Sequence, residues 1–202
     1  MEYKKLIIII NNKRMKIEQF KSLSDGYRVV LLIHRSKEGG FNNKKLRHLK
    51  KTITRNSEEF EKVVNEFEMI KNNDERSLRV YASINDRNLD KAIRLFKQRQ
   101  LDIEYGGNKD RFYTDLRSIF ISCLMKKEAK NNSNFLFDLD EIDERSLITT
   151  RKLLKNNTNI LLEYKTKNGV HIITEPFNYP KVLNEHLIKS LNVDGLMLLS
   201  FD

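Results

Sequence analysis

Two aspartates at the end of one apolar segment are the residues of this chain best suited to chemistry. The segment FLFDLD runs from Phe135 to Asp140, and Asp138 and Asp140 stand two residues apart. Side chains at that spacing project from the same face of a β-strand, so the two carboxylates repel each other unless a cation lies between them. Mg²⁺ is usually held by one or two carboxylates together with substrate phosphates, so the pair indicates metal-dependent phosphoryl chemistry. The alternative is a solvated turn before a helix, in which Asp143 and Glu144 favour the helix dipole.

A histidine follows in a hairpin downstream of the acidic segment. The sequence LLEYKTKNGVHIITEPF contains two segments of strand character. Lys167, Asn168 and Gly169 separate them and favour a tight turn, because Asn and Gly tolerate positive φ. His171 alternates with its apolar neighbours, so it projects from the polar face of its strand. Because His171 occurs in the same part of the sequence as the two aspartates, we expect it to belong to the same site. The alternative is a surface histidine without a function.

The elements that must position these residues follow a β-α-β-β-α-β order from residue 134 onward. We expect strands at 135–139, 160–165, 170–175 and 196–201, and helices at 144–155 and 180–190. This order is that of the ferredoxin-like or split βαβ arrangement, in which four strands form one sheet with both helices on one face. Palm-type nucleotidyltransferases and RNA-recognition modules both use that sheet, so the order alone does not identify a function. The sequence lacks the aromatic run that RNA-recognition modules carry on a central strand.

The first 130 residues predict a separate α/β part. The run VVLLI at 29–33 is typical of a strand buried on both faces, and 78–85 alternates as a half-buried strand does. Apolar residues at helical spacing predict helices around 60–70, from about 88, and over 112–124. The expected fold class is therefore α+β. An N-terminal α/β part over 1–130 joins a palm-like βαββαβ part over 131–202 in one compact catalytic-type domain.

Charge is distributed unevenly between these two parts. Residues 1–130 contain 30 Lys and Arg against 18 Asp and Glu, whereas residues 131–202 contain 8 against 10, for a net charge of +10 over the chain. This distribution suits a protein whose first part meets a phosphate backbone and whose last part holds a cation, although a solvated basic face is the alternative. The densest basic stretch supplies the candidate nucleic-acid contacts Lys44, Lys45, Arg47, Lys50 and Lys51.

Cysteine content and hydropathy exclude two classes of protein. A single cysteine, Cys123, rules out an internal disulfide framework, and its helical apolar surroundings predict a core thiol. The apolar run LIIII near the start is far shorter than the ~20 residues of a membrane span and lacks a cleavage signal. We expect a cytoplasmic protein with no membrane partner.

Asp138, Asp140 and His171 together resemble the motifs of the archaeo-eukaryotic primase and primase-polymerase superfamily. The first motif of that family corresponds to FLFDLD and the second, a small residue, any residue and histidine, to GVH within NGVHI. The third, an acid on a later strand, corresponds to Asp202 in LLSFD, with Asp194 as the second candidate. The resemblance covers roughly residues 134–202. The second motif departs from the family pattern because Gly169 stands where serine is usual.

This resemblance implies a metal-dependent nucleotidyltransferase that acts on DNA or RNA with nucleoside triphosphates. Asp138, Asp140 and Asp202 would bind Mg²⁺ or Mn²⁺, and His171 would contact the incoming nucleotide. A small, phage-like member of the family is the best fit, with replication proteins as candidate partners.

Three cations are candidate phosphate contacts beside that site: Lys165, Lys167 and, on the polar face of an earlier strand, Arg79. Two alternative functions stay open. One is a non-catalytic nucleic-acid-binding or inhibitory protein on the same fold, and the other is a metal-dependent nuclease.

Overall fold

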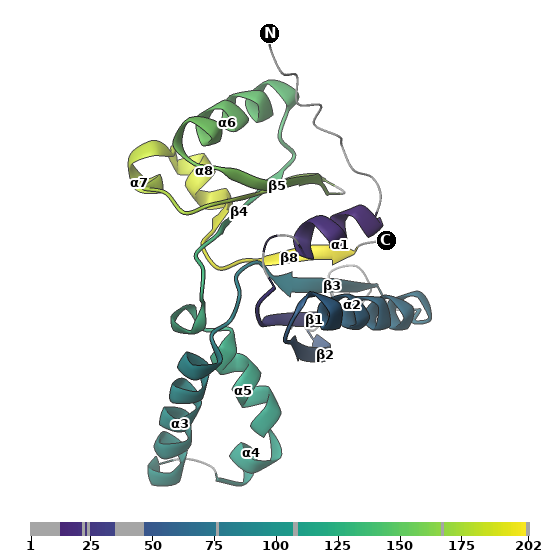
Figure 1. Ribbon diagram of the computed structural model, residues 1–202, viewed down its shortest axis with the longest axis vertical. Coiled ribbons are helices and arrows are strands. Elements are labelled where there is room, and N and C mark those ends of the chain that lie inside the picture. Colours follow the sequence, from purple (N-terminus) through teal and green to yellow (C-terminus); the bar gives the residue numbers. More distant parts are fainter. Residues whose placement is uncertain are drawn as a thin grey trace, which may run out of the picture. The chain divides into compact units, whose positions relative to one another are not determined.

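The computed structural model describes residues 13–21, 23, 25–34, 47–75, 77–106, 109–166 and 168–200. The chain divides into two compact units. Unit 1 comprises residues 1–23 and 135–192, and unit 2 comprises residues 24–134 and 193–202. Each unit is α+β and contains its own antiparallel four-stranded sheet (Figure 1). Residues 135–192 are therefore an insertion between two stretches of unit 2.

Unit 1 has the strand order β5-β6-β4-β7, and every neighbouring pair is antiparallel. Numbered along the chain, this is the order 2-3-1-4 expected of a βαββαβ sheet. The apolar and aromatic residues of the first strand and of the hairpin form its core, as their alternation requires. The elements are α1 (Lys13–Lys21), β4 (Phe135–Asp140), α6 (Glu144–Asn157), β5 (Ile160–Lys165), β6 (Gly169–Thr174), α7 (Tyr179–Val182), α8 (Glu185–Ser190) and β7 (Leu191–Asn192).

The last strand of the chain differs from its expected place. The segment expected at 196–201 does form a strand, β8 (Leu196–Ser200), but it pairs with β3 (Leu78–Ser83) in unit 2. The fourth place beside β4 is taken instead by the two-residue β7. Residues 197–199 are all buried, which suits a strand covered on both faces. Unit 1 thus comprises residues 135–192 and residues 1–23, which include α1, whereas the part expected from the sequence covers 131–202.

The expected helix at 180–190 is also divided. It forms α7 and α8, separated by two non-helical residues. The second of them, Asn184, is the N-cap of α8, and its side chain accepts a hydrogen bond from the backbone N–H of Leu187. An Asn side chain satisfies a free N–H at a helix start better than it supports a helix interior, so a new helix begins there.

Unit 2 has the strand order β2-β1-β3-β8. Its central strand β1 is buried on both faces, as the VVLLI run predicts. Asn56 is the N-cap of the helix α2 (Ser57–Asn72), and its Oδ1 accepts a hydrogen bond from the Glu59 backbone N–H at 2.9 Å. Helices α3 and α5 lie side by side (Figure 1), and the rings of Phe96 and Phe120 meet edge to face between them at 5.6 Å. The elements not yet given are β1 (Arg28–His34), β2 (Arg47–Thr54), α2 (Ser57–Asn72), α3 (Leu89–Gly106), α4 (Lys109–Thr114), α5 (Leu116–Leu124) and η2 (Lys127–Ala129).

The start of α6 gives a pH-dependent contribution to the stability of unit 1. Asp143 is the N-cap, and its hydrogen bonds with Ser146 hold the pKa of the Asp143 carboxyl below its usual value. The contribution is therefore present above the unfolded pKa of roughly 3.9 and lost as the pH falls through the lower folded pKa. Asp143→Asn keeps the capping oxygen but does not titrate.

We expect the difference in unfolding free energy between wild type and Asp143→Asn to change between pH 7 and pH 3, with the wild type losing more. Urea unfolding followed by circular dichroism at both values measures this. Equal pH dependence in the two proteins would contradict a charge-stabilised cap.

Candidate functional site

Asp138 and His171 lie opposite each other on the adjacent strands β4 and β6. The Nε2 atom of His171 is 2.8 Å from Oδ1 of Asp138, a hydrogen-bonding distance. The two side chains differ in exposure, since that of His171 is 8% exposed and that of Asp138 is 43% exposed. The carboxylate is thus the part of this pair that a ligand can reach.

A third residue, Tyr164 on β5, extends the row. It is the register partner of His171, and its hydroxyl hydrogen-bonds to Nδ1 of the imidazole. The two rings meet edge to face with centroids 5.0 Å apart. Tyr164 is buried, at 3% exposure. Three neighbouring strands therefore place Tyr164, His171 and Asp138 in one row on one face of the sheet.

Tyr164 was not among the residues identified from the sequence, although its position could have been deduced. The hairpin turns at 166–169, so the residues on either side of it pair outward from that turn. Counting back from Lys165 opposite Val170 places Tyr164 opposite His171.

The second acid, Asp140, lies at the end of β4 opposite Gly169. A Cβ atom on Gly169 would lie 2.0 Å from the carbonyl oxygen of Leu139, far inside contact distance. The glycine is therefore required by the close approach of two backbones. Asp140 consequently faces a position with no side chain, and its own side chain is exposed.

The backbone after Asp140 is fixed by the same hairpin. Glu141 has φ 54°, in the left-handed region that few residues other than glycine adopt. Its N–H donates to the carbonyl oxygen of Asn168 at 2.8 Å. The hairpin itself is closed by the Gly169 N–H, which donates to Oγ1 of Thr166 at 3.0 Å. The position of the acidic strand end is thus set by the hairpin that carries His171.

A cleft of about 710 Å³ lies beside the acids within unit 1. Asp138 and Asp140 line one part of it together with Glu141 and Asp143, and residues along α6 and α8 line most of the rest. Two of these, Arg145 and Lys189, bring exposed positive charge to the cleft. Sequence reasoning missed both, because an exposed basic residue on a helix carries no local signal that distinguishes it from an ordinary surface residue.

The donor chemistry of the two acids fits a hard divalent cation. Asp138 and Asp140 project from one face of β4, and the Asp138 side chain is 43% exposed. Mg²⁺ in nucleotide-processing sites is often held by one or two carboxylates, with waters and phosphates completing its coordination. Among the residues that the structure describes, no group of three or more His, Cys, Asp or Glu side chains is placed to hold a metal. Glu141 and Asp143 also line this cleft, and Asp138 and Asp140 are the two acids that share one face of β4.

The acids considered as a third ligand do not join this pair within unit 1. Asp194 belongs to unit 2, where both its oxygens accept hydrogen bonds from Arg87 at 2.9 Å. Its carboxylate is thus committed to a buried ion pair. Asp202 lies outside the described residues.

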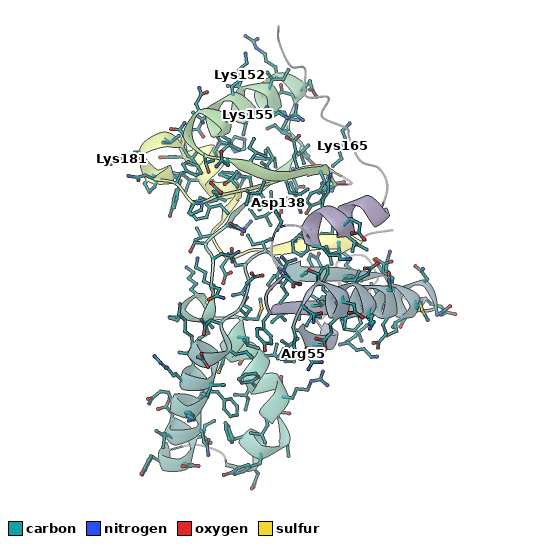
Figure 2. All side chains as sticks on the ribbon, viewed as in Figure 1. Arg55, Asp138, Lys152, Lys155, Lys165 and Lys181 are labelled. Atoms are coloured by element: carbon teal, nitrogen blue, oxygen red, sulfur yellow. The ribbon has the colours of Figure 1, made fainter. Side chains whose placement is uncertain are left out.

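Of the predicted phosphate contacts, one lies in unit 1, one lies in unit 2 and one is outside the described residues. Lys165 is exposed at the end of β5 (Figure 2), and strand alternation directs it to the face opposite Tyr164. Arg79 lies on β3 in unit 2, whereas His171 lies in unit 1. Lys167 lies outside the described residues.

Two of the predicted nucleic-acid contacts line a second cleft, of about 490 Å³, within unit 2. Lys50 forms an ion pair with Glu66 at 2.9 Å, and the amine of Lys51 donates to Oγ of Ser118. Arg117 also lines this cleft, beside the edge strand β2. Arg47 begins β2, and Lys44 and Lys45 lie outside the described residues.

Comparisons with known proteins add no relative to this description. No family model matches the chain, and neither a curated protein nor a solved structure matches it. Within the described residues, none of the helices is long and apolar enough to cross a membrane. The class is thus defined by the fold itself: an α+β protein with an inserted βαββαβ unit.

Proposed function

We propose that this protein is a metal-dependent nucleotidyltransferase of the primase-polymerase kind, which joins nucleoside triphosphates on a DNA or RNA strand. The observation that carries the proposal is the pairing of Asp138 with His171 on adjacent strands, with Asp140 two residues further along the same face. The 2-3-1-4 strand order of unit 1 supports it by fold-level analogy with palm-type sheets.

Asp138 and Asp140 would hold Mg²⁺ or Mn²⁺ in this function. When bound, the metal would supply Lewis-acid activation of a 3′-hydroxyl and neutralise charge on the leaving pyrophosphate. The chain itself keeps both carboxylates on one face of β4, and Gly169 leaves the space opposite Asp140 without a side chain. Arg145 and Lys189, in the cleft beside the acids, supply the positive charge that a triphosphate requires.

The nucleic-acid strand would lie along the basic part of the chain. The net charge of +12 over residues 1–130 favours a polyanion, because release of counterions from the phosphate backbone drives such binding. Within unit 2, Lys50, Lys51 and Arg117 line the cleft that would meet the phosphates.

The direct test measures incorporation of labelled ribo- and deoxynucleotides on primed and unprimed templates with Mg²⁺ or Mn²⁺. We expect the parent protein to extend a strand and the variant Asp138→Ala/Asp140→Ala to lose that activity, because the variant lacks both carboxylates proposed to hold the metal. The matched control is Asp102→Ala/Glu104→Ala, which removes two exposed carboxylates from α3 with the same change in net charge. Its incorporation should equal that of the parent.

Three results would contradict the proposal in different ways. Loss of incorporation in both double variants would point to charge or folding rather than to the acids of β4. Degradation of labelled nucleic acid without added nucleotides would identify a nuclease. Salt-sensitive binding without turnover, unchanged in Asp138→Ala/Asp140→Ala, would identify a non-catalytic nucleic-acid-binding protein.

A further inference from the structure

The exposed cations of unit 2 differ in whether their side chains have a partner within the unit. The three cations of the cleft beside β2 each make an ion pair or a hydrogen bond. Among the residues that the structure describes, five exposed cations of unit 2 have side chains that make neither: Arg94, Lys97, Arg99, Lys126 and Lys127. A phosphate can bind such a cation without first breaking a bond within the protein.

These five residues come from two segments that lie together, α3 and the turn that follows α5. The Asn88 N–H donates to the carbonyl oxygen of Ala129 at 2.6 Å, which joins the start of α3 to η2. Burial raises the pKa of the Cys123 thiol, and the positive charges of Lys126 and Arg99 act in the opposite direction. One cation from each segment is thus within electrostatic reach of the same thiol. The two segments therefore form one positively charged surface.

A stripe along α3 extends this surface. Lys91, Arg94 and Lys97 follow one another at three-residue spacing, which places neighbouring side chains on the same side of a helix, about 4.5 Å apart along its axis. The Lys91 amine donates to the carbonyl oxygen of Lys130 at 3.3 Å, so the stripe begins beside the turn that follows α5.

The balance of charge on this surface is positive. Its acids are Asp90 and Glu128, so six positive charges stand against two negative ones. Like charges at this spacing repel each other and destabilise a helix, and a polyanion that neutralises them is therefore bound favourably. The name α3 cation surface is used below for its basic residues, which are Lys91, Arg94, Lys97, Arg99, Lys126 and Lys127.

We propose that the α3 cation surface binds the phosphate backbone of a nucleic acid, as a second contact of unit 2 beyond the cleft beside β2. Arg117 lines that cleft from the first turn of α5, and Lys126 follows the end of the same helix. A nine-residue helix is about 14 Å long, so the two contacts are separated by several phosphates of one strand. This inference rests on the nucleic-acid part of the proposed function and does not depend on the metal site.

The test is the salt dependence of binding to labelled oligonucleotides of mixed sequence, single-stranded and duplex, measured by fluorescence anisotropy. Chelator is present and nucleotides are absent, so no turnover contributes. We expect Arg94→Gln/Lys97→Gln and Lys126→Gln/Lys127→Gln each to bind more weakly than the parent. Each phosphate contact contributes about 0.7 to the slope of log affinity against log salt on a single strand and about 0.9 on a duplex. Loss of two contacts should therefore weaken single-strand binding by roughly 25-fold at about 0.1 M salt.

The matched control is Lys152→Gln/Lys155→Gln. Both lysines are exposed on α6 of unit 1 (Figure 2), and their side chains make no ion pair or hydrogen bond within the described part of the chain. The control therefore removes the same charge from another surface and should keep the affinity and the salt slope of the parent. The charge-conserving variant Arg94→Lys/Lys97→Arg should also bind as the parent does.

Four results would overturn the inference. Parent-like affinity and slope in both α3-surface variants would remove this contact and leave strand extension by the parent, and with it the proposed function, intact. An equal loss in the α6 control would show that binding follows net charge alone. A folded parent that binds neither oligonucleotide would remove the nucleic-acid function as well. Binding to phosphatidylserine vesicles in place of either oligonucleotide would identify the surface as one for anionic lipid.

Discussion

Replacing Gly169 by alanine should destabilise unit 1 by about 2–3 kcal/mol, at the upper end of the usual cost of overpacking. The added Cβ would lie 2.0 Å from the carbonyl oxygen of Leu139 and 2.9 Å from Cα of Asp140. Both are backbone atoms of β4, so the contact cannot be relieved by a change of rotamer. The strands must separate, and this would displace the end of the strand that carries Asp138 and Asp140. Urea unfolding followed by circular dichroism measures the loss.

The control for this variant is Gly106→Ala. Gly106 ends α3, and a Cβ atom there would have no neighbour within 4 Å. The two substitutions change the unfolded chain alike, so their difference isolates the native contact. We expect Gly106→Ala to be neutral or stabilising by up to about 1 kcal/mol. If Gly169→Ala unfolds at the same urea concentration as the control, β4 and β6 are not in such close contact. The same contact predicts that serine is no better tolerated than alanine.

Replacing Asp194 by alanine should cost about 3–5 kcal/mol, the range observed when one partner of a buried ion pair is removed. The Arg87 side chain is 0% exposed and donates two hydrogen bonds to Asp194. Its Nε atom already has no hydrogen-bond partner among the described residues. Without the carboxylate, a buried guanidinium would lose its counter-charge, and the Nδ2 group of Asn85 would lose one acceptor. Thermal unfolding at neutral pH measures the effect.

Two further variants test whether the stability lost in Asp194→Ala comes from the buried ion pair. Glu58→Ala breaks an exposed ion pair with Lys62 on α2 and should leave the unfolding transition unchanged. The double variant Arg87→Met/Asp194→Leu removes both charges and should recover much of the stability lost in Asp194→Ala, since apolar replacement of a buried pair is often tolerated. A loss below about 1 kcal/mol in Asp194→Ala would show that water reaches the pair.

Features encoded by local patterns could be predicted from the sequence. The strand β1 has an uninterrupted apolar run, α2 has both a capping asparagine and a helical stripe, and β4 has apolar residues leading into two acids. The hairpin of β5 and β6 has turn residues between two strand segments. Each of these depends on contacts between residues close in the chain, so alternation and spacing suffice to locate it.

Features that depend on distant pairing could not be predicted. An apolar run such as 197–199 predicts a buried strand but does not say which sheet edge it joins, and β8 joins β3 rather than β4. The strand β7 has only two residues, too few for any periodicity. The strand β2 reads RHLKKTIT, in which the lysines that protect an edge strand hide its alternation. Likewise, nothing near Asp194 indicates Arg87, which lies 107 residues away.

The candidate site likewise has features that the sequence predicts and features that it does not. Alternation predicts that Asp138 and Asp140 share a face and that His171 leaves the apolar side of its strand, and the register of β4 with β6 agrees. The burial of His171 could not be predicted, because its hydrogen bonds join residues of three different strands.

The insertion of residues 135–192 into unit 2 fixes the order in which the chain can be completed during synthesis. The strand β3 ends at Ser83, and its partner β8 begins at Leu196. At the roughly 5–20 residues per second of translation, the intervening 112 residues take about 6–22 s to make. During that time one edge of β3 has unpaired N–H and C=O groups, whereas unit 1 can already close its hairpin. The sheet of unit 2 can therefore reach its full width only after the whole of unit 1 has been made.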